Sequence, residues 1–199
     1  MNDHTKERAH MLAERGYVAL ATDVFGEVPQ KPERMMELVG LLLGDLPTLR
    51  KRINFAHDLL KRQPNVDPNR TAGIGFCFGG STVLELARSG ADVKAVVGFH
   101  SGLQTTSPAQ NVKSKVLVCI GVDDPIIPAE QRDAFVKEMS DAKVDWQMLL
   151  QGGVGHSFTN KGIDAMNMPG FKYDAAADHR SWAAMQELFD RALGPVKPA

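Results

Sequence analysis

Three side chains that could together perform nucleophilic catalysis each follow a short apolar run of strand length. In chain order they are Cys77, Asp124 and His156. A thiol is a strong nucleophile once it is deprotonated, a histidine can accept its proton, and a carboxylate can fix the tautomer of that histidine and stabilise its charged form. We therefore predict that Cys77 is a nucleophile, His156 its base and Asp124 the orienting acid.

The surroundings of Cys77 are typical of a nucleophile held on a sharp turn. Residues 75–79 have the pattern Gly-x-Cys-x-Gly, between an apolar run and a segment whose apolar residues have helical spacing. A strained strand-to-helix turn leaves little room for side chains beside the nucleophile, which explains the glycines. The N-terminus of the following helix favours negative charge, so it promotes the thiolate, and the N–H of Phe78 is expected to bind an oxyanion. The alternative is a buried cysteine in an ordinary turn.

Other residues compete for these roles. Asp123 is adjacent to Asp124 and could be the acid, although position in the loop favours Asp124. His100 also follows an apolar run, but it precedes the acid in the chain, so we expect it to line the pocket instead. Cys119 lies between apolar residues and is predicted to belong to the core.

The elements that must position these residues alternate between buried strands and amphipathic helices. This order predicts an α/β fold with a mostly parallel sheet flanked by helices, in which functional groups gather at the carboxyl ends of the strands. The expected strands are 17–21, 71–76, 93–99, 115–121 and 144–150. Helices are expected over 4–15, 35–43 and 46–62, after the turn at Cys77, over 129–140, and in a last helix that buries Trp182, Met185, Phe189 and Ala192.

Composition narrows the functional class. The 199 residues include 23 basic and 24 acidic ones without a basic tract, so we expect one domain over residues 1–199 that binds neither nucleic acid nor a membrane. The polar N-terminus has no signal peptide, and we expect a cytoplasmic protein, monomeric or weakly homo-oligomeric. The sequence has no metal-ligand or nucleotide-binding motif, so no metal and no cofactor is expected. A small-molecule substrate is the remaining interpretation.

Several motifs together resemble the dienelactone hydrolase family of α/β-hydrolases. They are the Gly-Phe-Cys-Phe-Gly-Gly run at 75–80, residues 121–128, and His-Ser-Phe at 156–158, supported by 16–19, 23–26 and the tail over 175–189. The resemblance covers nearly the whole chain. It implies an α/β-hydrolase fold and cleavage of a small-molecule ester or lactone through a Cys-His-Asp triad and a thiol-ester intermediate.

Two departures from the family pattern qualify that expectation. The family places an arginine four residues after the catalytic histidine, whereas this chain has Asn160, so we expect the substrate to differ from the carboxylated dienelactone. The family also has strands before the first helix, so we expect an N-terminally truncated and weakly active hydrolase. The residues expected to line the pocket are Phe25, Phe76, His100, Phe158 and Asn160. Two alternatives are a non-catalytic or weakly active binding protein of the same fold and a DJ-1/PfpI-like cysteine-elbow protein.

Overall fold

The computed structural model describes residues 3–196, which form two compact units. The first comprises residues 3–68 with 195–196, and the second is Asn69–Gly194. The single domain expected over residues 1–199 stays a prediction.

The first unit contains three helices, α1 (Asp3–Glu14), α2 (Pro32–Gly44) and α3 (Leu46–Lys61). Helix α3 begins after Asp45, whose carboxylate accepts the N–H of Thr48 at 3.1 Å and so satisfies one of the unpaired donors of the first turn. The loop that contains Phe25 is tied to this helix, because Arg52 donates hydrogen bonds to the carbonyl oxygens of Val24 and Phe25 at 2.6 and 2.9 Å.

The prediction of a strand at residues 17–21 is wrong. This run has no strand in the structure, and the side chains of Val18 and Leu20 are 44% and 40% exposed. A strand exists only where a neighbour completes its backbone hydrogen bonds, and within the described part of the first unit no segment forms such a ladder with residues 17–21. An apolar run of the right length is therefore insufficient to make a strand.

The second unit contains a parallel sheet in the order β1-β2-β3-β4, with strands β1 (Ala72–Phe76), β2 (Ala95–Phe99), β3 (Lys115–Gly121) and β4 (Trp146–Gln151). The predicted strands 71–76, 93–99, 115–121 and 144–150 differ from these by at most two residues at each end. Strands β2 and β3 are buried almost throughout, which explains why they appear in the sequence as continuous apolar runs. Because the strands are parallel, their carboxyl ends share one edge of the sheet.

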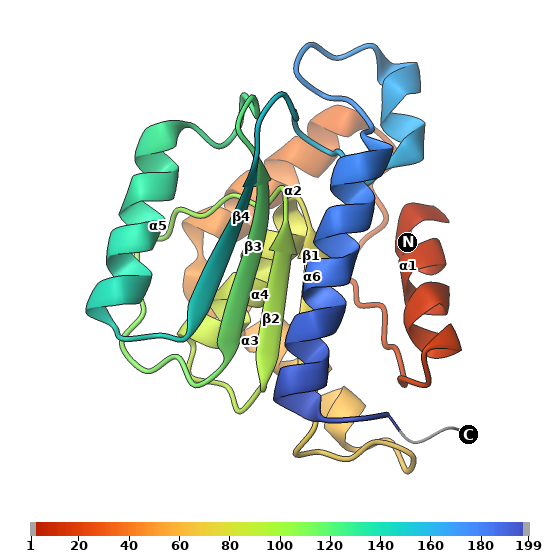
Figure 1. The fold of residues 1–199 in the computed structure, drawn as a ribbon, viewed down its shortest axis with the longest axis vertical. Coiled ribbons are helices and arrows are strands. Elements are labelled where there is room, and N and C mark those ends of the chain that lie inside the picture. Colours follow the sequence, from red (N-terminus) through yellow and green to blue (C-terminus); the bar gives the residue numbers. More distant parts are fainter. Residues whose placement is uncertain (1–2, 197–199) are drawn as a thin grey trace. The chain divides into compact units, whose positions relative to one another are not determined.

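Helices cover both faces of this sheet. Helix α4 (Phe78–Arg88) packs on β1 and β2, α6 (Ala175–Leu193) packs on β2 and β3, and Figure 1 shows them on opposite faces. Helix α5 (Ala129–Asp141) connects β3 to β4. Trp182, Met185 and Phe189 of α6 are buried as expected, and Ala192 is half-buried. A short 3-10 helix, η1 (Lys161–Met166), lies between β4 and α6.

A buried ion-pair cluster joins α4 to α5 and to the loop after β2. Arg88 donates to Glu85 at 2.9 Å, to Glu138 at 2.7 Å and to the carbonyl oxygen of Leu103 at 2.8 Å. The carboxylate of Glu138 also accepts the backbone N–H of Ala109 at 2.8 Å. The charge of Arg88 is therefore balanced by two shielded carboxylates, and Arg88 and Glu138 also have backbone partners, which helps to offset their lost hydration.

Candidate active site

Cys77 lies on a strained turn between β1 and α4. Its backbone has φ 51° and ψ −121°, in the left-handed region that residues other than glycine rarely adopt. A Cβ at Gly75 would lie 2.0 Å from the carbonyl oxygen of Gly79, and a Cβ at Gly80 would lie 1.6 Å from the hydroxyl of Ser101. Only glycine fits at these two positions, so the glycine pattern in the sequence is a requirement of the turn.

The structure brings Cys77, His156 and Asp124 together in a row. The Nε2 atom of His156 lies 3.3 Å from the Sγ atom of Cys77, and its Nδ1 atom lies 2.7 Å from the Oδ2 atom of Asp124. The other carboxylate oxygen, Oδ1, accepts the backbone N–H of Ile126 at 2.8 Å. His156 and Asp124 are only 1% and 4% exposed, whereas Cys77 is exposed. The sulfur can therefore meet a substrate while its two partners are shielded from water.

The electrostatics of this row favour a charged histidine. Burial opposes the charge on His156, but hydrogen bonds to Asp124 and Cys77 outweigh it and raise the pKa of His156 to about 9. An imidazolium beside a sulfur stabilises the thiolate, which is the nucleophilic form. Cys119 differs, because burial outweighs a hydrogen bond to Ser181 and raises the pKa of its thiol to about 12.

The loop that carries His156 is fixed by backbone contacts with the segment near residue 170. The N–H of His156 donates to the carbonyl oxygen of Gly170 at 2.7 Å, and its own carbonyl oxygen accepts the N–H of Lys172 at 3.1 Å. A Cβ at Gly155 would lie 2.3 Å from that oxygen of Gly170, so the close approach requires a glycine. The ring of Phe171 packs edge-on against that of His156, with 4.8 Å between centroids.

His100 is in contact with this row. The Phe76–Phe99 and Phe99–Cys119 register places Cys77 and His100 together, one residue beyond the paired strand ends. The backbone N–H of Cys77 lies 3.2 Å from the Nδ1 atom of His100, and the Nε2 atom of His100 lies 2.8 Å from the hydroxyl of Thr159. Sequence reasoning placed His100 only in the pocket wall and missed Thr159, which is 59 positions away in the chain.

The remaining residues expected at the site occupy varied positions. Phe158 is fully buried, 5.1 Å from the ring of His100, and Phe76 stacks on Phe99 at 4.8 Å. Phe25 belongs to the first unit. The side-chain oxygen of Asn160 accepts the N–H of Gly162 at 3.0 Å and so caps η1. Roles in substrate binding for Phe25, Phe76, Phe158 and Asn160, and in oxyanion binding for Phe78 at the start of α4, stay predictions.

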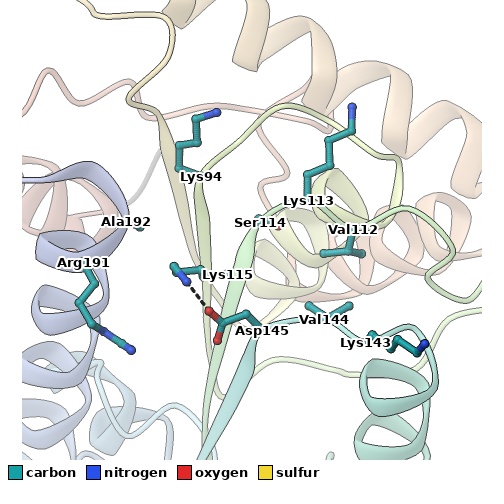
Figure 2. Close-up of a pocket in the computed structure, with 10 residues that line it drawn as sticks. All are labelled: Lys94, Val112, Lys113, Ser114, Lys115, Lys143, Val144, Asp145, Arg191 and Ala192. Atoms are coloured by element: carbon teal, nitrogen blue, oxygen red, sulfur yellow. Dashed lines mark hydrogen bonds and ion pairs between the residues drawn. The ribbon is translucent and has the colours of Figure 1, made fainter.

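A pocket of about 340 Å³ lies elsewhere, near the starts of the strands. It contains none of the residues predicted for the site. Figure 2 shows Lys94 and Lys113 pointing away from Arg191, while Lys115 is paired with Asp145. Its cations therefore do not converge on a common point. The ten residues that line it are Lys94, Val112, Lys113, Ser114, Lys115, Lys143, Val144, Asp145, Arg191 and Ala192.

Residues 3–196 contain neither a candidate metal cluster nor a candidate membrane-spanning helix. Within that range, no group of three or more histidine, cysteine or acidic side chains has an arrangement that could hold a metal ion. Among the helices of the same range, none combines the length and the apolar character needed to cross a membrane.

Comparison with known proteins identifies the family. The model of the dienelactone hydrolase family matches residues 1–193. An uncharacterized protein of Caenorhabditis elegans is 32% identical to this chain over 152 residues, which cover 73% of this chain and 94% of that protein. A carboxymethylenebutenolidase homologue of Xenopus tropicalis is 27% identical over 168 residues, which cover 82% of this chain and 68% of that protein. The crystal structure of a dienelactone hydrolase-like promiscuous phosphotriesterase from metagenomic libraries has a TM-score of 0.92 and 43% identity, covering 97% of this chain and 82% of that one. The chain belongs to the dienelactone hydrolase family, has the α/β-hydrolase fold, and is a hydrolase.

Proposed function

We propose that this protein hydrolyses an ester or lactone of a small molecule through a covalent thiol-ester on Cys77. The observation that supports this best is the row in which the Nε2 atom of His156 lies 3.3 Å from Sγ and Nδ1 lies 2.7 Å from Asp124. Nucleophile, base and orienting acid thus have the mutual distances that covalent acyl transfer needs.

In the first half of the proposed reaction, the thiolate of Cys77 attacks the carbonyl carbon and the carbonyl oxygen becomes an oxyanion. The N–H of Phe78, at the N-terminus of α4, donates to that oxygen. When the C–O bond breaks, the leaving alkoxide takes the proton held by His156. The acyl group is then joined to sulfur, and His156 is neutral.

In the second half, neutral His156 removes a proton from water. The resulting hydroxide attacks the thiol-ester carbon, the C–S bond breaks, and the carboxylic product leaves while the thiolate and the imidazolium are restored. Asp124 stays ionised throughout and holds the Nδ1–H of His156, so that Nε2 faces the reacting atoms.

We further propose that the preferred substrate lacks a free carboxylate. Asn160 stands where the resemblance leads us to expect an arginine, and its side-chain oxygen already caps η1. An amide cannot form the two charge-assisted hydrogen bonds with which a guanidinium holds a carboxylate. A carboxylated lactone should therefore show no advantage in KM over its methyl ester, and a strong preference for the free acid would contradict this proposal.

The proposed nucleophile is tested by comparing two single variants with p-nitrophenyl acetate and iodoacetamide. Cys77→Ala should lose both turnover and alkylation, whereas Cys119→Ala should retain both because its thiol is buried. Alkylation of Cys119 in the wild type would contradict the assignment. A wild-type protein without turnover on esters or lactones would instead favour the binding-protein alternative.

Phosphotriester hydrolysis is a second candidate activity. It is favoured by the 43% identity to a protein described as a promiscuous phosphotriesterase. The same thiolate could attack phosphorus, with the leaving aryl oxide departing and the N–H of Phe78 donating to the phosphoryl oxygen. Turnover of a p-nitrophenyl dialkyl phosphate that disappears in Cys77→Ala would support this, and turnover that survives the substitution would refute it.

A further inference from the structure

The ring of His100 contacts both the backbone of the proposed nucleophile and the ring of the proposed base. On one side its Nδ1 atom is 3.2 Å from the backbone nitrogen of Cys77, and on the other its Nε2 atom is 2.8 Å from the hydroxyl of Thr159. Its centroid is 5.1 Å from that of His156, at an interplanar angle of 66°. His100 is 2% exposed and has φ 40°, so the loop accepts a strained backbone to keep this ring in place.

These contacts determine where His100 carries its proton. A backbone N–H can only donate, so the Nδ1 atom that faces Cys77 must be an unprotonated acceptor. The proton of a neutral ring is then on Nε2, where the hydroxyl oxygen of Thr159 can accept it. A ring protonated at both nitrogens would instead point an N–H at the N–H of Cys77.

The hydrogen bond between Cys77 and His100 constrains the residue that carries the proposed nucleophilic sulfur. The N–H of Cys77 is shared between Nδ1 of His100 and the carbonyl oxygen of Phe99, which lies at 3.0 Å. Both acceptors hold the backbone of Cys77 in its left-handed conformation, which directs the side chain. The ring of His156 itself contacts those of His100 and Phe171, with centroid distances of 5.1 and 4.8 Å.

We propose that His100, held by Thr159 as the neutral tautomer with its proton on Nε2, is a positioning residue that fixes both the backbone of Cys77 and the ring of His156. This inference rests on the proposed function, because it assigns Cys77 as the nucleophile. His100 itself transfers no proton to or from the substrate. Its effect is on the distance and direction between Sγ and Nε2 of His156, on which the rate depends steeply.

The tautomer can be measured in the unaltered protein. Imidazole ¹⁵N NMR of the full chain at neutral pH distinguishes a protonated from an unprotonated ring nitrogen, and His100→Asn identifies its signals. The expected result is a neutral His100 with Nδ1 unprotonated and Nε2 protonated. A proton on Nδ1, or a doubly protonated ring, would overturn the proposal without reference to activity.

Variants test the effect on the reaction. His100→Asn keeps a hydrogen-bond acceptor near the position of Nδ1, whereas His100→Leu removes it. The kcat for p-nitrophenyl acetate should therefore fall on the order of tenfold to a hundredfold in the leucine variant and much less in the asparagine variant. KM should change little in both. Alkylation of Cys77 by iodoacetamide should slow in parallel. The matched control is His179→Leu, at an exposed position of α6, which should leave kcat unchanged. A folded His100→Leu protein with wild-type kcat would overturn the proposal.

Thr159 provides a second route if His100→Leu fails to fold. Thr159→Val removes the acceptor for Nε2–H, so it should lower kcat and increase the share of the other tautomer in the NMR spectrum, while Thr159→Ser should restore both. An unchanged tautomer and kcat in Thr159→Val would contradict the proposal. Turnover retained in Cys77→Ala would show that Cys77 is not the nucleophile and would contradict the proposed function. The NMR measurement on the wild type is separate from that result, because it tests only the contacts of His100.

Discussion

Replacing Asp124 by asparagine tests the proposed support of His156 with minimal change of shape. The side-chain oxygen Oδ1 that accepts the N–H of Ile126 at 2.8 Å can be kept by asparagine, so the loop should retain its conformation. The other oxygen, Oδ2, becomes an amide nitrogen, which can only donate to Nδ1 of His156. The proton of His156 would then lie on Nε2, facing the sulfur, where it cannot act as a base.

The size of the effect follows from the pKa of His156. Its rise from 6.5 to about 9 in the folded protein corresponds to roughly 3 kcal/mol in favour of the imidazolium, at about 1.36 kcal/mol for each pKa unit. Asp124 is one of the two hydrogen-bond partners that produce this rise. Loss of the contribution of Asp124 would lower kcat/KM on the order of tenfold to a hundredfold, and the wrong tautomer would add to the loss.

The assay is the kcat/KM for p-nitrophenyl acetate at neutral pH, together with circular dichroism to verify the fold. Asp123→Asn is the matched control, because Asp123 is the adjacent carboxylate, is exposed, and should leave kcat/KM unchanged. An Asp124→Asn protein that is folded and within about threefold of the wild type would refute the reasoning. A large loss in Asp123→Asn alone would show that the adjacent carboxylate is the acid.

Three further outcomes are expected. Gly75→Ala should prevent folding of the turn at Cys77, because the added Cβ would lie 2.0 Å from the backbone. Gly79→Ala should retain the wild-type melting temperature, because nothing lies within 4 Å of the added Cβ. Equal melting temperatures for the two variants would contradict this. The second outcome concerns the difference in free energy of unfolding between the wild type and His156→Asn. This difference should be greatest below pH 6.5 and should fall by up to roughly 3 kcal/mol as the pH rises through about 9, because only the folded state has the raised pKa of His156. A difference independent of pH would refute it. Arg88→Met should lower the free energy of unfolding by about 3–5 kcal/mol in denaturant titrations, because it removes the opposite charge from two shielded carboxylates. Glu138→Gln added to it should recover part of that loss, and full stability of the single variant would contradict the role of the cluster.

Local sequence patterns predicted the α/β fold because the strands of the observed sheet coincide with short segments rich in apolar residues, of which β2 and β3 are continuous apolar runs. The glycines around Cys77 were informative for the same reason, since the strain that they relieve is local to the turn. The order of Cys77, Asp124 and His156 along the chain also indicated residues that the structure places in hydrogen-bond contact.

The features that the sequence did not predict depend on interactions between residues that are far apart in the chain. Residues 17–21 have the composition of a strand, but pairing depends on a neighbour that composition does not reveal. The contact of His100 with Cys77 depends on the register of β1 and β2, and its contact with Thr159 spans 59 positions without any periodic pattern. His100 could have been placed beside Cys77 only once both strands were known to end at the same level.

In the proposed reaction, the substrate's acyl group passes through a covalent bond to Cys77. Rapid acid quenching during turnover of p-nitrophenyl acetate, followed by mass spectrometry of the intact protein and of its peptides, measures this directly. We expect one acetyl group per chain, on the peptide that contains Cys77. It should be absent from Cys77→Ala and from the peptide that contains Cys119. An acetyl group on any other residue, or full turnover by Cys77→Ala, would contradict it.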